Sequence, residues 1–361
     1  MDNKLIKEFD SVSQRAIYGL NLMYSEFEPI ESSSADEGCQ ARLHGLMGRM
    51  IGRLYENPML LGLPGSKDEA FQKYELNNMN PGLDKIYQSM FKSLYEFYRF
   101  LYMSALHGGI QAESLFVGNE ALKIGKAPYK TQYGALLGEV GIIAAKDKEG
   151  VTLAADNSLL RAMKLLAEKV PVNVSPWTPF ALINFAACSF TGSFGYLLPR
   201  ADSINNLGGM LIGLEKRCLE KGYATSIECS MTLTDLGFAI VFKRGVGGFS
   251  IGYRARKYQQ FQFGTLNGIG EKAMIEDFGN LDTDMQTHFI NICRICNQCL
   301  GCTKNGKNQV FTVNVEYKDK SYSLCPSFPN HSWDTIDENL ISLLFKYHDA
   351  QERYGTDWKK K

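Results

Sequence analysis

Five of the nine cysteines in this chain of 361 residues lie close together in its C-terminal part. Four of them follow one another with two residues between each pair, and the fifth comes further along, directly before a proline: Cys293, Cys296, Cys299, Cys302 and Cys325. Two cysteines with this spacing can wrap a tight turn and direct both thiolates at one metal ion. The spacing therefore predicts a metal site made of thiolate ligands.

Zinc is the metal that this set of ligands favours. Four thiolates around Zn²⁺ form a closed tetrahedral site, which stabilises a segment too small to have a hydrophobic core of its own. We expect the four ligands to be Cys296, Cys299, Cys302 and Cys325, because Cys293 can belong to the last turn of a preceding helix. His331 is a spare candidate ligand.

An iron–sulfur site is the alternative to zinc. Three cysteines at this spacing and a distant Cys-Pro pair, here Cys325-Pro326, also bind one [4Fe–4S] cluster in ferredoxin-like proteins. A fourth cysteine at the same short spacing departs from that pattern. In this interpretation the protein is an iron–sulfur oxidoreductase or a redox sensor.

The residues around the cysteines predict the elements that bring Cys325 to the others. A helix at 281–292 leads into the cluster. Apolar and polar residues then alternate over 310–317, and 322–325 returns after a turn, which is the pattern of a hairpin. A helix over 336–354 follows, with Asp334 as its expected cap.

This part of the chain resembles a known group of proteins. The motif Cys-x2-Cys-x2-Cys-Thr-Lys, the alternating hairpin and Leu-Cys-Pro-Ser-Phe-Pro are similar to a C-terminal signature of uncharacterised bacterial proteins. The resemblance covers residues 268–354 and implies a bacterial cytoplasmic protein, but no activity. It matches Cys296, Cys299, Cys302 and Cys325, and Cys293 is not part of the signature.

Residues 110–169 have the order of elements found in a winged helix. The predicted elements are two short helices, a hairpin with a charged tip and a closing helix, at 113–124, 129–140, 141–155 and 159–169. This order makes a DNA-binding transcription regulator a further alternative, although α+β domains of other functions share it. Only Lys126 and Lys130 lie near the start of the candidate recognition helix, which is few for phosphate contacts.

The whole chain is predicted to be an α+β protein with three parts. We expect a helical domain in 1–108, an α+β domain with antiparallel strands in 109–280, and the zinc-ribbon-like module with a C-terminal helix in 281–361. The helix at 83–107 is dense in aromatic residues at helical spacing, so it should lie at the centre of a bundle. Gly245–Gly248 should be a hairpin turn rather than a phosphate-binding loop, because no helix follows it.

Composition limits the function further. Lysine plus arginine and aspartate plus glutamate number 39 each, so a nucleic-acid role would need a local basic surface. The N-terminal residues lack the apolar stretch of a secretory signal, and clustered cysteines fit a reducing compartment, so we expect a cytoplasmic protein. The uncharged stretch between Lys169 and Arg200 contains prolines, glycines and Asn184, which favours a buried segment over a membrane span.

No sequence motif identifies a reaction, so the enzyme question stays open. The leading interpretation is a non-catalytic binding or regulatory protein with a structural zinc site. Its α+β middle would bind a small ligand or a protein partner.

Overall fold

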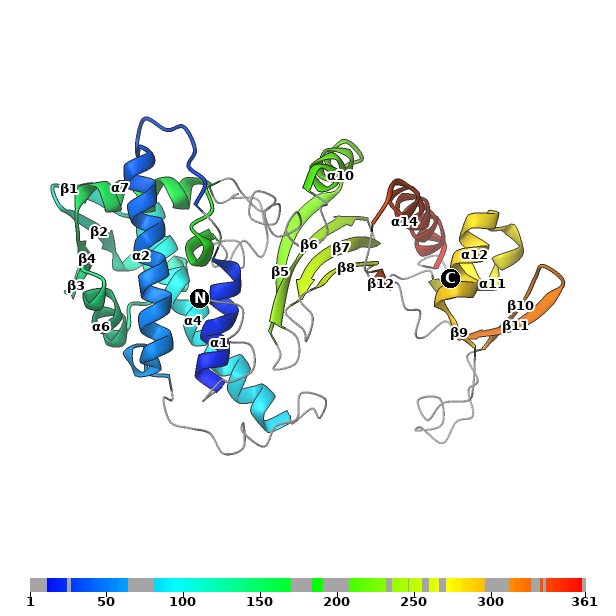
Figure 1. The fold of residues 1–361 in the computed structure, drawn as a ribbon, viewed down its shortest axis with the longest axis horizontal. Helices are drawn as coiled ribbons and strands as arrows, with labels where there is room; N and C mark the ends of the chain where they lie inside the picture. Colours follow the sequence, from blue (N-terminus) through cyan, green and yellow to red (C-terminus); the bar gives the residue numbers. More distant parts are fainter. Residues whose placement is uncertain are drawn as a thin grey trace. The chain divides into compact units, whose positions relative to one another are not determined.

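The structure is a computed structural model, and it combines helices with antiparallel sheets (Figure 1). The predicted mixed α+β class is therefore confirmed. The residues that the structure describes are 12–24, 27–63, 81–169, 184–190, 208–231, 236–245, 247–254, 260–265, 271–295, 312–325, 332–333 and 336–358.

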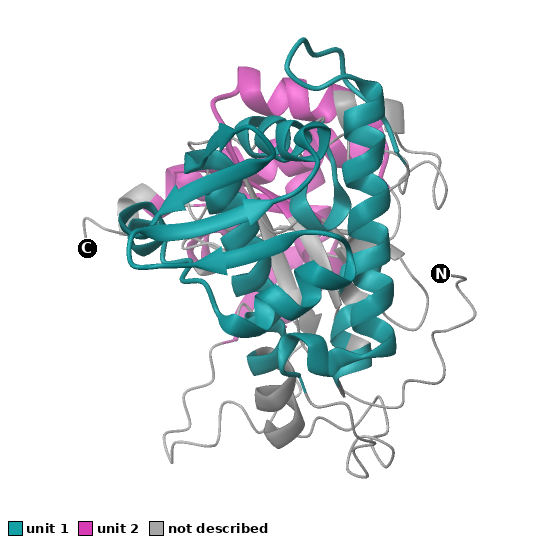
Figure 2. Ribbon diagram, turned by 90° about the vertical axis from the view of Figure 1, so that its left-hand side faces the viewer, with its two compact units in different colours: residues 1–208, 226–238, 254–259 teal, residues 209–225, 239–253, 260–361 magenta. Residues whose placement is uncertain are grey.

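The chain divides into two compact units, which Figure 2 shows in different colours. Unit 1 comprises Met1–Gly208, Ser226–Phe238 and Arg254–Gln259, and unit 2 comprises Gly209–Thr225, Ala239–Tyr253 and Gln260–Lys361. The elements of 1–108 and of 109–169 thus belong to one unit. The division predicted from the sequence, with boundaries after residues 108 and 280, stays a prediction.

Long helices form the core of unit 1. They are α1 (Val12–Met23), α2 (Glu37–Glu56), α4 (Pro81–His107) and α7 (Asn157–Lys169). α4 packs against α1 and α7, and α2 packs against the same two helices. The aromatic face of α4 is buried, which confirms the central position predicted for this helix; its buried rings are Phe91, Phe97, Tyr98, Phe100 and Tyr102.

A four-stranded antiparallel sheet follows α4 in unit 1. Its strands are β1 (Gly109–Gln111), β2 (Ser114–Gly118), β3 (Ile143–Lys146) and β4 (Gly150–Ala154), in the order β1-β2-β4-β3. Alternate residues of β2 and β4 are buried and attach the sheet to the core: Leu115, Val117, Val151 and Leu153. The predicted hairpin with a charged tip is confirmed as β3–β4.

Two short helices lie between these hairpins in the sequence, α5 (Asn119–Ile124) and α6 (Thr131–Glu139). The helix predicted at 113–124 is wrong in its first half, because Ser114–Gly118 pairs with β4 as a strand. The predictions of a helix at 129–140 and of a closing helix are confirmed by α6 and α7.

Part of the uncharged stretch lies inside unit 1. All residues of 184–190 are buried, as expected for a core segment. Among the residues that the structure describes, no helix is both long enough and apolar enough to cross a membrane.

A five-stranded sheet follows α10 (Gly208–Glu220). Its strands are β5 (Ala224–Met231), β6 (Leu236–Arg244), β7 (Gly247–Arg254), β8 (Gln260–Thr265) and β12 (Ser332–Trp333), in the order β12-β8-β7-β6-β5. Neighbouring β6 and β7 confirm the hairpin turn predicted at the glycine-rich sequence.

Helix α14 (Glu338–Trp358) explains why this turn is rich in glycine. Gly245 has a φ of +59°, and a Cβ atom there would lie 2.5 Å from Oε1 of Glu352. A Cβ atom on Gly247 would lie 2.6 Å from Oε1 of Gln351. Glycine at 245 and 247 therefore leaves room for the side chains of α14 that lie against the turn.

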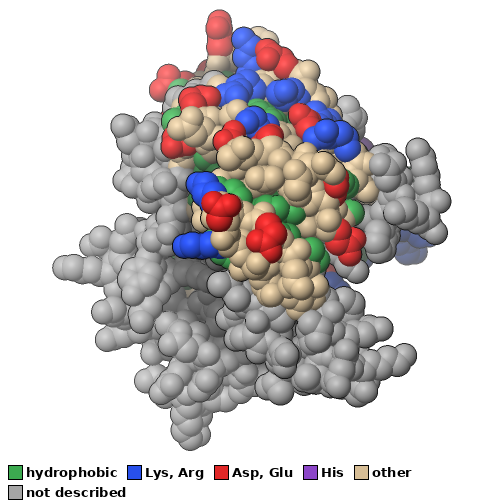
Figure 3. Space-filling view, turned by 90° about the vertical axis from the view of Figure 1, so that its right-hand side faces the viewer, with side chains coloured by type: hydrophobic (Ala, Val, Ile, Leu, Met, Phe, Trp, Pro, Cys, Tyr) green, Lys and Arg blue, Asp and Glu red, His purple; other side chains and the backbone are tan. Residues whose placement is uncertain are grey.

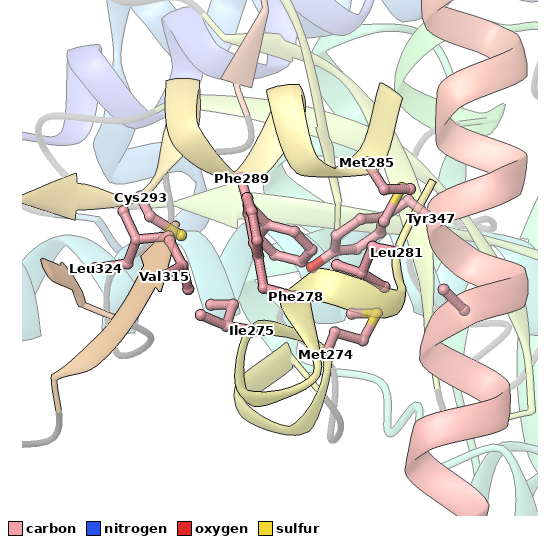
Figure 4. Close-up of a cluster of buried hydrophobic side chains, with 11 residues drawn as sticks. Met274, Ile275, Phe278, Leu281, Met285, Phe289, Cys293, Val315, Leu324 and Tyr347 are labelled. Carbon is pink, nitrogen blue, oxygen red and sulfur yellow. The ribbon is translucent and has the colours of Figure 1, made fainter. Parts of the chain in front are cut away.

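The C-terminal part of unit 2 surrounds a second hydrophobic core (Figure 4). Its elements are α11 (Glu271–Glu276), η3 (Phe278–Asn280), α12 (Thr283–Ile292) and a sheet of β9 (Arg294–Ile295), β10 (Val313–Tyr317) and β11 (Lys320–Cys325), ordered β10-β11-β9. The predicted hairpin is confirmed by β10 and β11, and the predicted alternation is confirmed over Val313–Tyr317, the part of it that the structure describes. Residues 296–311 lie outside the described residues, so the zinc-ribbon-like module stays a prediction.

The start of α14 differs from the prediction. The helix begins at Glu338, and the carboxylate of Asp337 accepts the backbone N–H of Leu340 at 2.7 Å. Asp337 therefore has the capping role that we expected of Asp334, which lies outside the described residues.

Candidate functional sites

The first candidate site lies in unit 1, where α5 adjoins the β3–β4 hairpin. Asn119 begins α5 and binds the hairpin turn twice: its backbone N–H donates to the carbonyl of Glu149 and its Nδ2 to the carbonyl of Lys148, both at 2.9 Å. Asp147 accepts the backbone N–H groups of Gly150 and Glu149, and these bonds lower the pKa of its carboxyl. The hairpin is thus fixed against the start of α5.

The end of α5 has a backbone conformation that glycine normally adopts. Lys126 has a φ of +50°. Its N–H donates to the carbonyl of Lys123 at 3.0 Å, and the N–H of Ala127 donates to that of Leu122 at 2.9 Å, as in a Schellman motif. A side chain in this left-handed region costs about 1 kcal/mol. A lysine is therefore held where glycine would be more stable.

Three lysines from different segments surround a pocket beside α5. The pocket has a volume of about 250 Å³ and is lined by Asn119, Leu122, Lys123, Lys126, Pro128, Tyr129 and Lys146. No acidic residue is among these. Within the described part of the chain, Lys123, Lys126 and Lys146 form no ion pair. The pocket is therefore basic, and we call it the lysine pocket.

Lys130 has a different environment from Lys126. Its Nζ lies 2.7 Å from Oε2 of Glu96 on α4, so its charge is already neutralised. Of the two lysines singled out in the sequence, only Lys126 faces the pocket. Lys123 and Lys146 were missed, because only the pairing of the hairpin with α5 brings them together; the charged hairpin tip was the available signal.

Helix α6 is anchored by one face and exposes the other. Tyr133 is buried, and its ring lies 5.1 Å from that of Phe97 and 5.4 Å from that of Phe100. Burial raises the pKa of Tyr133 well above its usual range. The exposed residues on the other face are Thr131, Ala135, Gly138 and Glu139. Thr131, Ala135 and Gly138 are small, whereas Glu139 adds a carboxylate that lies 3.9 Å from Nε of Arg53.

The predicted metal ligands are only partly within the described residues. Cys296, Cys299, Cys302 and His331 lie outside them, so their geometry stays a prediction. Cys325 ends β11, which pairs with β9 so that Cys325 is opposite Arg294, two positions before Cys296. The hairpin thus returns Cys325 to the start of the cysteine cluster, as expected.

Cys293 and Cys325 face opposite sides of their sheet. Cys293 is buried in the hydrophobic core beside Leu324 and Val315 (Figure 4). Its backbone is extended, with φ of −76° and ψ of +132°, and it leads directly into β9. Successive residues of a strand point to opposite faces, so Cys325 points away from the face on which Leu324 and Cys293 lie.

A third cluster joins the β6–β7 turn to α14 in unit 2. The guanidinium of Arg244 donates to both carboxylate oxygens of Glu352, at 3.2 and 2.9 Å, and to Asp349. It also lies 4.7 Å from the centre of the Tyr223 ring. Burial alone would lower the pKa of Arg244, but the bonds to Asp349 and Glu352 outweigh it and raise the pKa.

His348 completes this cluster. It is buried, its Nδ1 lies 2.8 Å from the hydroxyl of Tyr223, and burial lowers its pKa. Its side chain, with those of Asp349 and Glu352, offers ligand atoms within 4.8 Å of one another, as in a metal site. Arg244 already supplies a cation to both carboxylates, which disfavours a metal ion there. We therefore interpret the cluster as a structural link.

A groove of about 540 Å³ separates α12 from α14 in unit 2. The rings of Trp333 and His288 are stacked with their centres 5.6 Å apart, and both line the groove together with Leu340. An ion pair of 2.6 Å joins Lys346 to Asp284 across the two helices. This volume suits a small organic ligand.

Acidic and basic side chains are mixed on the described surface that Figure 3 shows, which is the side drawn on the right in Figure 1. Neither sign dominates there, in agreement with the equal numbers of acids and bases in the sequence. On this face a charged partner would be selected by individual residues rather than by a broad field.

The chain matches no protein-family model, no curated protein and no solved structure.

Proposed function

We propose that the protein is a DNA-binding regulatory protein and that unit 1 contains its winged helix. The observation that carries this proposal is the order α4, β2, α5, α6, β3, β4 combined with the sheet order β2-β4-β3. In a winged helix, two helices join the first strand to a hairpin, and the last strand of that hairpin lies in the middle of the sheet. The β3–β4 hairpin is the wing in this assignment.

Helix α6 is then the helix that enters the major groove. Its buried side is fixed by Tyr133, Leu136 and Leu137, so the helix is held rigidly by the core. Three of the four residues on its exposed face, Thr131, Ala135 and Gly138, are small enough for the backbone to approach the bases closely. Thr131 is the uncharged polar residue on that face, whereas the Glu139 carboxylate, 3.9 Å from Nε of Arg53 on α2, would repel phosphates. Phosphate contacts must therefore come from residues outside this face.

Ala135→Glu tests this assignment. The new carboxylate would lie on the exposed face of α6, where it would meet the phosphates and bases without disturbing the core. We expect binding of a fluorescein-labelled duplex, measured by anisotropy at low salt, to weaken at least about tenfold. Leu219→Glu is the matched control, since it adds the same charge at an exposed helical position in unit 2.

Equal affinities of the Ala135→Glu and Leu219→Glu variants would show that α6 does not contact DNA. Absence of binding by the unmodified protein at low salt would reject the DNA-binding proposal as a whole. Circular dichroism of each variant must match that of the parent protein.

A structural zinc site in unit 2 is the second part of the proposal. Cys325 is buried, lies beside the start of the cysteine cluster, and faces away from the hydrophobic core. These features support Cys296, Cys299, Cys302 and Cys325 as the ligand set, whereas the packing of Cys293 gives that residue a role in the core. Zinc would link the sheet to the segment between β9 and β10.

Metal analysis and an absorbance spectrum of protein purified without air test the metal. About one zinc ion per chain without visible absorbance is the expected result. Iron and sulfide with a broad visible band would replace zinc by a [4Fe–4S] cluster and favour a redox sensor. Protein without metal would reject both.

The groove between α12 and α14 is the place we propose for a small ligand of the regulator. Its stacked ring wall and polar rim suit a planar molecule with hydrogen-bonding groups. A fluorescence titration in which Trp333→Phe removes the ligand-dependent signal would support this.

A further inference from the structure

We infer that the lysine pocket, formed by Lys123, Lys126 and Lys146, binds a phosphate group, and that the sugar–phosphate backbone of duplex DNA supplies it. The DNA source rests on the proposed function, whereas the phosphate chemistry rests on the pocket itself. Neither Lys123 nor Lys146 stood out in the sequence.

Convergence of charge is the first argument. The three lysines come from α5, from the turn after α5 and from β3, and they meet at one pocket without an acidic residue in its lining. A bound anion would neutralise these positive charges, which no described acid pairs with. By contrast, the charge of the nearby Lys130 is neutralised within the protein by its ion pair with Glu96.

Rigidity is the second argument. The two hydrogen bonds of Asn119 to the hairpin turn fix β3 relative to α5. Lys146 therefore does not depend on a mobile hairpin to reach the other two lysines. A pocket whose charges are already in place loses less entropy when an anion binds.

The backbone at Lys126 is the third argument. Glycine would fit its left-handed conformation better, yet a charged side chain stands there and lines the pocket. Strained positions of this kind are concentrated at functional sites. The apolar walls formed by Leu122, Pro128 and the Tyr129 ring fit a sugar attached to the phosphate.

Size and position favour DNA over a free metabolite. A volume of about 250 Å³ is enough for a phosphate with part of its sugar but is below the usual range for a small-molecule site. The pocket adjoins α5 and β3, the elements that flank the recognition helix in a winged helix, where phosphates are contacted.

The test measures DNA affinity as a function of salt for four variants. Lys123→Gln and Lys146→Gln remove single charges, and Lys126→Gly removes a charge while relieving backbone strain. The triple variant combines these three changes. Lys216→Gln, at an exposed position of α10 in unit 2, is the matched control. A loss of binding in Lys126→Gly cannot be attributed to unfolding if its melting temperature is unchanged or higher.

We expect each single variant to bind a 30-base-pair duplex about tenfold more weakly at low salt, and the triple variant to bind it more weakly than any of them. In a plot of log affinity against log salt concentration, the slope of the triple variant should be about 0.9 smaller in magnitude, since the pocket contacts one phosphate and its loss removes about 0.9. The control should not change.

Titrations with inorganic phosphate and ribose 5-phosphate separate the two sources. If the parent protein binds ribose 5-phosphate but not DNA, and the triple variant binds neither, the pocket is a phosphate site for a small molecule and the proposed function fails. If the triple variant binds DNA with the parent slope, the pocket inference is overturned while the proposed function stands. If the parent binds neither DNA nor phosphates, both are overturned.

Discussion

Replacing Cys293 with alanine should leave the metal content of the protein unchanged and destabilise unit 2. The prediction follows from the packing of this side chain, which is 5% exposed and belongs to the core around Phe289 and Leu324 (Figure 4). Removing the sulfur takes away one atom of roughly methylene size. That loss costs about 0.8 kcal/mol in transfer free energy. A small residual cavity brings the total to about 1–1.5 kcal/mol.

Cys325→Ser is the matched variant with the opposite expectation. Cys325 lies on the other face of the sheet, and serine is nearly the same size but a poor ligand for zinc. Its packing should change little, whereas the metal content should fall below one ion per chain. A metal-loaded segment would then lose the stability that the metal supplies.

The assay combines metal analysis with urea unfolding followed by circular dichroism. The reasoning predicts full metal content and a lower urea midpoint for Cys293→Ala, and metal loss for Cys325→Ser. If Cys293→Ala loses the metal while Cys325→Ser keeps it, then Cys293 and not Cys325 binds the metal, and the reasoning is refuted.

Two further predictions concern unit 2. Lys318 and Asp319 both have positive φ in the β10–β11 turn, at 49° and 59°, so changing them to Asn-Gly should raise the free energy of unfolding by about 1 kcal/mol in urea titrations. Burial lowers the pKa of His348, so below pH 6.5 the unfolded chain gains a proton that the folded chain does not. The urea concentration at the unfolding midpoint should therefore fall between pH 7 and pH 5, and it should fall less steeply in His348→Gln. An equally steep fall in both proteins would show that His348 does not cause the pH dependence.

The elements set by local periodicity could be predicted from the sequence. α4, α10 and the β10–β11 hairpin were found because their apolar residues recur at helical or strand spacing. Residues 113–118 could not be assigned in this way. They are a strand because β2 pairs with β4, and a strand of five residues has too few alternations to show in the sequence.

The candidate sites were predictable as residue types but not as geometry. Cysteine spacing identifies a possible set of ligands, yet it cannot show that Cys293 faces the core, because that depends on the register of β9 against β11. Likewise, the lysine pocket depends on the placement of β3 beside α5. Both are long-range pairings, which periodicity does not encode.

Lys130 forms an ion pair with an acid, whereas Lys126 forms none within the described residues, and this difference has a measurable consequence. Lys130 lies 2.7 Å from Glu96 and connects the start of α6 to α4, so Lys130→Gln should lower the free energy of unfolding by about 0.5 kcal/mol. Phosphate binding should survive in that variant. Lys126→Gly should instead raise the free energy of unfolding, since it relieves a strained backbone. It should also weaken phosphate binding, since it removes a charge that no described acid neutralises. If both variants changed stability and binding in the same direction, the two lysines would share one role and the separation would be wrong.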